Sequence, residues 1–311
     1  MTSGHDQTSA PASARENSGT AGSGIAKVSG QAPGSNVAVR QVTFHVRRYV
    51  PGEDSQPRWQ DYRIDCPPGM TVLEGLWKIK ETLDPGLSWR FSCRMGICGS
   101  CGMLINGRPR LACNTQVAEF SGDRIALAPL PNFDIIRDLV PDLAPLFERH
   151  QRVQPFLLRE DTEECERPTG EFEQSAHELE SYLQFSYCIK CGCCMAACPT
   201  FATSRDYAGP MPLAQAHRYN TDSRDGGFGQ RKRVLGGDGG PWRCHFAGEC
   251  SVVCPKGVDP AKAVQIMKRE LVLDLLRLRK RRCPSPPMPA PDPAKRPADS
   301  PVAPPPTVTG V

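Results

Sequence analysis

The cysteines of this 311-residue chain fall largely into short runs that have the spacing of metal ligands. The first run is spaced C-x4-C-x2-C and is followed by one more cysteine, giving Cys93, Cys98, Cys101 and Cys113. This is the plant-type arrangement that holds a [2Fe–2S] cluster. Glycines between these cysteines let backbone N–H groups approach sulfur closely, and such hydrogen bonds raise a cluster's reduction potential. The run therefore predicts a [2Fe–2S] site.

Two later runs follow the pattern of a protein with two further clusters. The first reads C-x2-C-x2-C-x3-C-P and comprises Cys188, Cys191, Cys194 and Cys198. In this pattern the fourth cysteine binds the other cluster, so a partner run is required. The partner run comprises Cys244, Cys250 and Cys254. Ala247 occupies the position at which the pattern calls for one more cysteine.

Seven thiolates cannot complete two four-iron clusters. If the last cysteine of each run binds the cluster of the other run, the first of these clusters is a [4Fe–4S] cluster with the ligands Cys188, Cys191, Cys194 and Cys254. The remaining thiolates predict a [3Fe–4S] cluster with the ligands Cys198, Cys244 and Cys250. Because Cys194 and Cys198 are separated by about one helical turn, ~6 Å of rise, the two clusters are expected to be near neighbours.

Other uses of the cysteines remain open from the spacing alone. A structural zinc site would replace the four-residue gap after Cys93 with a second C-x2-C knuckle. Cys193 could take the place of Cys194 under a different choice of spacing, although we interpret it as a bystander. Cys66, Cys165 and Cys283 stand alone, which is typical of buried or tail thiols without a ligand role.

Strands and a hairpin are expected to position the first run. Residues 41–47 alternate apolar and polar side chains, which indicates a half-buried strand, and Tyr62 and Ile64 continue the pattern. Thr71 and Glu74 form a capping-box pair before a helix with an apolar stripe at Val72, Leu76, Ile79 and Leu83. Asn106-Gly107 predicts a two-residue hairpin turn between Met103-Leu104-Ile105 and Arg110-Leu111.

Helices are expected to position the later runs. After Pro131, the apolar residues Ile136, Leu139, Leu143 and Phe147 recur at helical intervals. Asp259 and Pro260 supply an N-cap and a first-turn proline for a last helix that is predicted to end near Arg282. One face of this helix is expected to carry Val264, Met267, Leu271, Leu275 and Leu278.

Composition favours an intracellular protein with two domains. Residues 1–36 lack an apolar signal segment and contain only Arg15 and Lys27 as basic residues, which argues against secretion and against a mitochondrial transit peptide. No apolar run reaches the roughly 18 residues that span a bilayer. A dispersed net charge of +4 gives no reason to expect nucleic acid. Residues 1–36 and 283–311 are low-complexity and are predicted to be disordered.

The order of these motifs resembles the iron–sulfur subunit of succinate dehydrogenase and fumarate reductase. The resemblance covers residues 38–282 and includes Ser92-Cys93-Arg94, Gly96-Ile97-Cys98-Gly99-Ser100-Cys101, Pro129-Leu130-Pro131, Ile136-Arg137-Asp138-Leu139, Asp222-Ser223-Arg224-Asp225 and Arg243-Cys244-His245. It implies an α+β chain: a plant-type ferredoxin-like β-grasp domain at 37–135, then an all-α, bacterial-ferredoxin-like domain at 136–282.

The resemblance also implies partners. Electrons would pass one at a time between the flavin (FAD) of a separate flavoprotein subunit and a membrane quinone, through the [2Fe–2S], [4Fe–4S] and [3Fe–4S] clusters. The chain would bind membrane anchor subunits, with or without haem b, and would lie peripherally at the cytoplasmic face of a bacterial inner membrane. We find no dinucleotide fingerprint, P-loop or nucleophile elbow, so no catalytic residue for substrate chemistry is predicted on this chain.

The quinone end carries two open alternatives. His245, next to Cys244, would bind or protonate quinone oxygen, or else it would hydrogen-bond cluster sulfur or backbone. Ubiquinone-linked relatives carry a tryptophan after Cys-Pro, whereas Phe201-Ala202-Thr203 stands here, which favours menaquinone. The basic residues Lys268, Arg269, Arg277, Arg279, Lys280, Arg281 and Arg282 would face anionic lipid or form a solvated helix face.

Competing classes make different predictions. A cluster subunit of another quinone-linked or heterodisulfide-type oxidoreductase would share the helical part but often lack the plant-type run, and Cys113 argues against it. A free electron carrier would copurify with no flavoprotein or anchor. A zinc-bound interaction module would be colourless.

Overall fold

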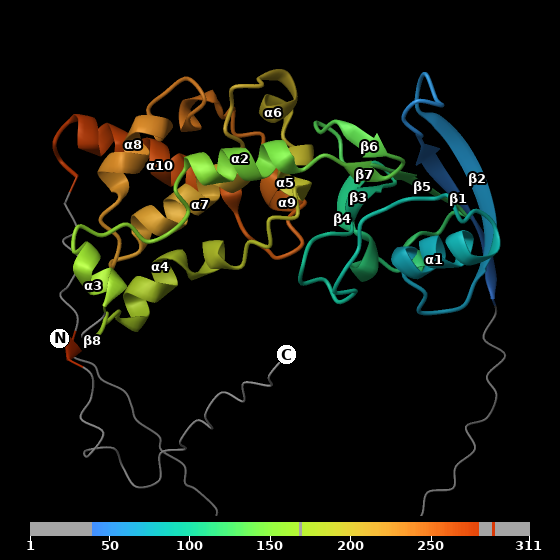
Figure 1. The fold of residues 1–311 in the computed structure, drawn as a ribbon, viewed down its shortest axis with the longest axis horizontal. Coiled ribbons are helices and arrows are strands. Elements are labelled where there is room, and N and C mark those ends of the chain that lie inside the picture. The colour runs from blue at the N-terminus through green and yellow to red at the C-terminus, as the bar shows by residue number, and fades with distance from the viewer. Residues whose placement is uncertain (1–38, 168–169, 280–287, 290–311) are drawn as a thin grey trace, which may run out of the picture. The chain divides into compact units, whose positions relative to one another are not determined.

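The structure, a computed structural model, describes residues 39–167, 170–279 and 288–289 (Figure 1). Within them the chain is α+β, with a sheet in the first part and helices in the second. The sheet has five strands in the order β2-β1-β5-β3-β4. Its strands are β1 (Arg40–Arg48), β2 (Arg58–Cys66), β3 (Gly102–Ile105), β4 (Arg108–Leu111) and β5 (Arg124–Ala128).

The two strands predicted from alternating side chains pair with each other. β1 and β2 are antiparallel, with Phe44 opposite Tyr62 and Val42 opposite Ile64, and β1 also pairs in parallel with β5. Because successive side chains of a strand point to opposite faces, Val42, Phe44 and Val46 all enter the core. The predicted hairpin is confirmed, since Asn106 and Gly107 both adopt positive φ between β3 and β4.

Helix α1 (Val72–Thr82) covers the buried face of the sheet, as the capping box predicts. Thr71 and Glu74 satisfy each other's backbone N–H groups, which fixes where the helix begins. Gly75 packs so closely on β1 that a Cβ atom there would lie 2.4 Å from Cζ of Phe44. Leu76 and Ile79 are buried as expected, whereas Leu83 lies past the helix end and is 52% exposed.

The segment after Pro131 differs from its prediction. The helical spacing of Ile136 and Leu139 is misleading, because residues 135–141 form a small antiparallel pair, β6 (Ile135–Arg137) and β7 (Val140–Pro141). Asp138 turns the chain between them at φ 45°, and the next helix, α2 (Ala144–Arg152), begins only later. Tertiary hydrogen bonds to Asp138 override the local helical pattern.

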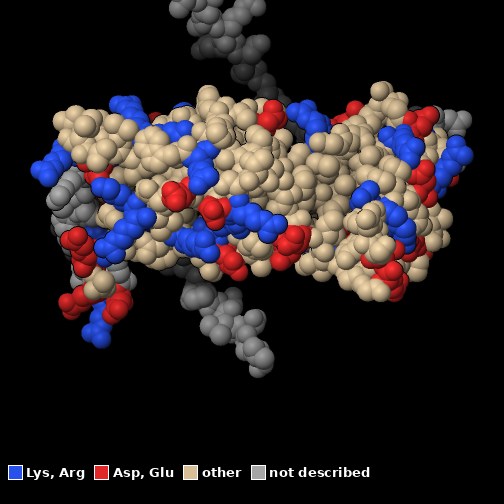
Figure 2. All heavy atoms as spheres, turned by 90° about the horizontal axis from the view of Figure 1, so that it is seen from above, with Lys and Arg blue, Asp and Glu red and all other residues tan. Residues whose placement is uncertain are grey.

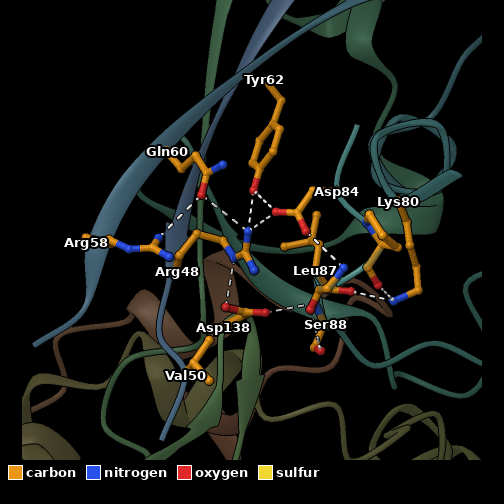
Figure 3. A network of polar contacts seen from close by, with 12 residues as sticks. Arg48, Val50, Arg58, Gln60, Tyr62, Lys80, Asp84, Leu87, Ser88 and Asp138 are labelled. Atoms are coloured by element: carbon orange, nitrogen blue, oxygen red, sulfur yellow. Dashed lines mark hydrogen bonds and ion pairs between the residues drawn. The ribbon is translucent and has the colours of Figure 1, made fainter. Parts of the chain in front are cut away.

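A buried polar network links this turn to the sheet (Figure 3). Asp138 accepts hydrogen bonds from Nε of Arg48 at 2.8 Å, from the backbone N–H of Tyr49 at 3.0 Å and from that of Ser88 at 2.9 Å. Arg48 also contacts Tyr62 and Asp84, while Tyr62 donates to Asp84 at 2.5 Å. Burial raises the pKa of Tyr62, so its hydroxyl stays a donor. Ser88 begins the segment that leads to Cys93, so the network anchors the approach to the first cysteine run.

The second part is helical, as predicted from the cysteine-run surroundings. Besides α2, its α-helices are α3 (Thr162–Glu166), α4 (Ala176–Ser186), α5 (Cys193–Ala196), α6 (Pro199–Thr203), α7 (Pro210–Thr221), α8 (Phe228–Leu235), α9 (Glu249–Val252) and α10 (Pro260–Leu275). It also has a short 3-10 helix at Pro241–Arg243, and two others lie in the first part, at Ala112–Asn114 and Val117–Glu119. The central α7 packs against both α4 and α10 (Figure 1).

A fully buried arginine holds the helical part together. Arg231 of α8 forms an ion pair with Asp225 at 2.7 Å, and both side chains are almost fully shielded from water. Its guanidinium also donates to the carbonyl oxygens of Gln154 and Phe156, at 3.0 and 2.6 Å. A buried charge requires such complete pairing, so the segment after α2 is tied firmly to α8.

The last helix begins as predicted and ends earlier. Asp259 caps α10 by accepting from the N–H of Lys262, and Val264, Met267 and Leu271 are buried. The helix ends at Leu275 instead of Arg282, because Arg277 adopts φ 58° and reverses the chain. Leu275 and Leu278 are 78% and 67% exposed, so no packing surface extends the helix further.

Some predictions fall outside the described residues. These include the tail at 1–36, Lys280, Arg281, Arg282, Cys283 and most of the tail at 283–311. Within the second tail the structure describes only Met288–Pro289, which form β9 and pair with β8 (Gly170–Glu171). In the ranges that the structure covers, no helix combines the length and hydropathy that a bilayer crossing requires.

Candidate iron–sulfur sites

The first cysteine run forms a loop whose backbone points at its own sulfur atoms. The N–H groups of Ile97 and Cys98 donate to Sγ of Cys93 at 3.3 and 3.2 Å, and the N–H of Gly96 donates to Sγ of Cys113 at 3.2 Å. Such a curled backbone requires left-handed conformations, which Gly96 and Gly99 supply at φ 71° and 74°. The donors fit sulfur that carries negative charge, as the thiolate ligands of a cluster do.

The thiols of this loop differ in their acidity. Burial opposes ionisation of Cys98, but hydrogen bonds from Ser100 and from the backbone of Cys93 outweigh it and lower its pKa to about 6. Burial raises the pKa of Cys101 to about 12. A positive charge next to Cys101 would be needed to keep it ionised, and cluster iron would supply that charge.

The second predicted ligand set surrounds one enclosed cavity. Its wall includes all four predicted [4Fe–4S] ligands, Cys188, Cys191, Cys194 and Cys254. Its other walls are mainly apolar, with Met211 and Val258 among them, so the sulfur atoms are partly shielded from water. Cys193, next in sequence, is not part of this wall.

The third predicted set surrounds a separate cavity. Cys198, Cys244 and Cys250 line it together with Ala247. Ala247 occupies the wall at the position where a fourth cysteine is missing from the run. Cys198 is the N-cap of α6 and lies outside α5, so the expected single helical turn between Cys194 and Cys198 is instead a break between two short helices.

Burial of both sets disfavours free thiolates. It raises the pKa of Cys188 and of Cys250 to about 11, and it also raises the pKa of Cys194, Cys198 and Cys254. Clustered thiols in apolar cavities ionise only beside compensating positive charge. Backbone donors are present here too, because the N–H groups of Phe201 and Phe246 each lie 3.4 Å from Sγ of Cys198 and Cys244, respectively. These donor sets and cavities fit iron–sulfur clusters.

Cys193 faces a different environment from that of Cys194. It is fully buried and packs in the core of the first part with Cys101, Cys113 and Leu130. A hydrogen bond from Cys193 lowers the pKa of Cys191. Cys66 is likewise buried, at 3% exposure, as its isolation in the sequence predicts.

The predicted quinone end lies at the surface beside the third cavity. His245 is exposed, as are its neighbours Trp242 and Phe246, which are 52% and 60% accessible to solvent. Among the described residues, none forms a hydrogen bond with its imidazole that would support the cluster-sulfur alternative. On the face shown in Figure 2, basic and acidic side chains are interspersed, in agreement with the dispersed charge of the sequence.

Two residues lie near the third set without a role there in the sequence analysis, which did not single out Tyr207 and assigned Lys268 to the basic stretch. Tyr207 is buried at 1% exposure, and burial together with the negative potential of Cys244 and Cys198 raises its pKa. Lys268 donates to the carbonyl oxygen of Cys244 at 2.8 Å, instead of projecting freely with the basic stretch to which we assigned it. In the sequence, only the place of Lys268 next to the buried Met267 pointed to this contact.

Comparison with known families matches both parts of the chain. Residues 43–148 match a 2Fe-2S iron-sulfur cluster binding domain, and residues 184–258 match a 4Fe-4S dicluster domain. The first range contains the loop from Cys93 to Cys113, and the second contains the cysteines of both cavities. The first match ends within α2, and the second begins within α4.

Curated relatives cover most of the chain. The fumarate reductase iron-sulfur subunit of Mycobacterium tuberculosis is 45% identical over 228 residues, covering 73% of this chain and 92% of the relative. That of Haemophilus influenzae is 42% identical, covering 75% and 94%. The succinate dehydrogenase iron-sulfur subunit of Paracoccus denitrificans is 38% identical, covering 74% and 87%.

A solved structure has the same fold. A chain of the Mycobacterium smegmatis Sdh1 complex in the apo form superposes with a TM-score of 0.66 and 27% identity, covering 76% of this chain and 98% of that chain. The plant-type loop, the two cysteine-lined cavities and these relatives agree with one another. The chain belongs to the family of iron–sulfur subunits of succinate dehydrogenase and fumarate reductase.

Proposed function

We propose that this chain conducts single electrons between the flavin of a catalytic subunit and a membrane quinone through three iron–sulfur clusters. The observation that carries the proposal is the division of the later cysteines between two cavities, one lined by four thiols and the other by three. The ligand sets are Cys93, Cys98, Cys101 and Cys113 for [2Fe–2S], then Cys188, Cys191, Cys194 and Cys254 for [4Fe–4S], and Cys198, Cys244 and Cys250 for [3Fe–4S].

The residues of this chain would set the path and shield it. When bound, each cluster accepts and releases one electron without substrate chemistry. The thiolates hold the iron, and backbone N–H groups, such as that of Gly96, stabilise the charge on sulfur. Apolar walls, including Met211 and Val264, would shield the second and third sites in part from water. No described side-chain group is required to bind succinate or fumarate.

Exposed apolar residues support partner contacts at both ends of the path. Met95 and Ile97, in the first loop, are 72% and 56% exposed, which suits a surface covered by the FAD-containing flavoprotein. Trp242, His245 and Phe246 suit contact with a membrane anchor, with or without haem b, and with a quinone. Phe201-Ala202-Thr203 favours menaquinone over ubiquinone. The chain would lie peripherally at the cytoplasmic face of a bacterial inner membrane.

The proposed domains follow the same division. Residues 37–135 would form a plant-type ferredoxin-like, β-grasp domain, supported by the mixed order β2-β1-β5-β3-β4 with α1 packed on one face. Residues 136–282 would form a bacterial-ferredoxin-like helical domain, although α10 ends at Leu275.

Redox-titrated electron paramagnetic resonance of the purified complex tests this function. We expect three signals: two that appear on reduction and one from a three-iron centre in the oxidised state. Succinate should reduce at least one of them, and a quinol analogue should reduce the same centres from the other end. Iron and labile sulfide sufficient for fewer than three clusters, or copurification without a flavoprotein, would contradict the proposal.

A further inference from the structure

The loop of the first cysteine run touches a predicted ligand of the second cluster. A Cβ atom at Gly99 would lie 2.7 Å from Cβ and 2.9 Å from Cα of Cys191. It would also lie 3.2 Å from the carbonyl oxygen of Ile189. Carbon atoms in favourable contact are about 3.5–4.0 Å apart, so no side chain fits between these two segments. The backbone of one cysteine loop therefore rests directly on the other.

A second glycine extends the same contact. A Cβ atom at Gly102 would lie 3.1 Å from the carbonyl oxygen of Cys191 and 3.5 Å from Leu130. Leu130 also lies 3.3 Å from the corresponding position at Gly192. Cys193 and Cys101 belong to the same buried core. The junction between Gly99, Gly102 and Cys191 is thus closely packed.

The left-handed backbone of the first cysteine loop does not by itself explain the close contact between Gly99 and Cys191. Gly96 lies in the same loop and has nearly the same left-handed backbone as Gly99, with φ 71° against 74°. A Cβ atom at Gly96 would meet only the side chain of Asn114, at an ordinary 3.8 Å. Both glycines satisfy the curl of the loop, but only Gly99 permits contact with Cys191.

We propose that Gly99 and Gly102 are positioning residues that hold the [2Fe–2S] loop against Cys191, so that electrons cross between the first two clusters at this contact. The inference rests on the proposed ligand assignment. In this step one electron leaves the first cluster and enters the second. The first cluster is oxidised by one electron, the second is reduced by one electron, and no bond is formed or broken. Because tunnelling weakens steeply with distance and through gaps, direct backbone contact with a ligand maximises the coupling.

Three alanine variants in the assembled complex separate the contact from the turn. Gly107→Ala, in the turn between β3 and β4, introduces left-handed backbone strain at φ 76° where a Cβ atom would meet nothing within 4 Å. Gly102→Ala introduces a tight contact with Cys191 at a position without positive φ, and Gly99→Ala introduces both. The measurement is the spin–lattice relaxation of the reduced [2Fe–2S] centre with the [4Fe–4S] centre first oxidised and then reduced, because the enhancement reports the distance between them.

We expect the enhancement in Gly107→Ala to equal that of the wild type, with a partial loss in Gly102→Ala and a larger loss in Gly99→Ala. Reduction of the [4Fe–4S] centre by succinate-reduced [2Fe–2S] should slow in the same order. Unchanged enhancement in Gly99→Ala with intact clusters would overturn the inference.

The test remains decisive if the Gly99→Ala variant loses a cluster, because Gly102→Ala is the milder change. If Gly99→Ala fails to retain its [2Fe–2S] centre, Gly102→Ala decides, and wild-type enhancement there would count against the contact. Failure of the proposed function would be seen differently, because the wild-type complex itself would then lack one of the two signals.

Discussion

The guanidinium of Arg48 and the carboxylate of Asp138 form an ion pair almost entirely shielded from water, with Nε 2.8 Å from Oδ1 and side-chain exposures of 5% and 0%. Asp138 accepts two backbone N–H groups in addition, from Tyr49 and Ser88. The pair joins β1 to the turn between β6 and β7 and to the segment that leads to Cys93 (Figure 3).

Replacement of Asp138 by alanine should destabilise the first part of the chain strongly. Removal of Asp138 leaves Arg48 with Asp84 as its remaining carboxylate and leaves the backbone N–H groups of Tyr49 and Ser88 without this acceptor, which together costs about 3–5 kcal/mol. The midpoint of thermal unfolding, followed by the visible absorbance of the cluster, measures the loss. Asp123→Ala is the control, because Asp123 is 83% exposed in its pair with Arg40 and should contribute about 0–1 kcal/mol. Equal shifts in the two variants would contradict the prediction.

Adjacent buried cysteines should respond differently to substitution. Cys194→Ala removes a thiol from the wall of the second cavity, so the [4Fe–4S] signal should be lost. Cys193→Ala is closely matched in sequence and burial, but it should keep all three clusters, with only a modest decrease in the unfolding temperature. Iron content and electron paramagnetic resonance of both variants provide the measurement. Loss of the four-iron centre in Cys193→Ala alone would reverse the assignment.

A cysteine at Ala247 should change the third centre. Ala247 lines the cavity of Cys198, Cys244 and Cys250, so Ala247→Cys would provide a fourth thiolate. The oxidised-state three-iron signal should decrease, and a new signal of a reduced four-iron centre should appear. Val252→Cys adds a thiol in α9 at a residue that is 62% exposed and outside that cavity, so its spectrum should match the wild type. An unchanged spectrum in Ala247→Cys would argue against the third ligand set.

His150 should make the folded chain less stable in mild acid. The side chain in α2 is 8% exposed, and its buried Nε2 has no hydrogen-bond partner among the residues that the structure describes. Burial, together with the nearby charge of Lys190, lowers its pKa to about 4. The unfolded chain, with a pKa near 6.5, binds the proton first. Stability is therefore complete above about pH 6.5 and falls between about pH 6.5 and 4, by at most ~3 kcal/mol.

The difference between His150→Leu and the wild type isolates this effect from other titrating groups. As the pH decreases from 7 to 5, the wild type should lose more of its unfolding temperature than the variant does. His177→Leu, at an exposed position of α4, should follow the wild type. Parallel pH profiles for wild type and His150→Leu would contradict the prediction.

Features determined by neighbours in sequence could be predicted. The alternation in β1, the capping box of α1 and the Asn106-Gly107 turn depend on a few consecutive residues, and all three are confirmed. The cysteine spacing likewise indicated which thiols the structure brings around each cavity. Contacts between segments that are distant in the sequence could not be predicted, because no local pattern of residues indicates them. Asp138 disrupts a helical pattern through bonds to Arg48 and Ser88, and the contact of Gly99 with Cys191 follows no spacing rule.

Each of the two cavities takes cysteines from both the earlier and the later run, so neither cluster site can be complete until the later run has been synthesised. On the proposed assignment, the four-thiol site needs Cys254 and the three-thiol site needs Cys244 and Cys250, so neither can be finished from residues before 244. A nascent polypeptide must leave the ribosome almost to its last helix before iron can be secured at either place. A premature stop codon after Cys113 and before Cys244 would thus abolish both centres together and spare only the earlier one.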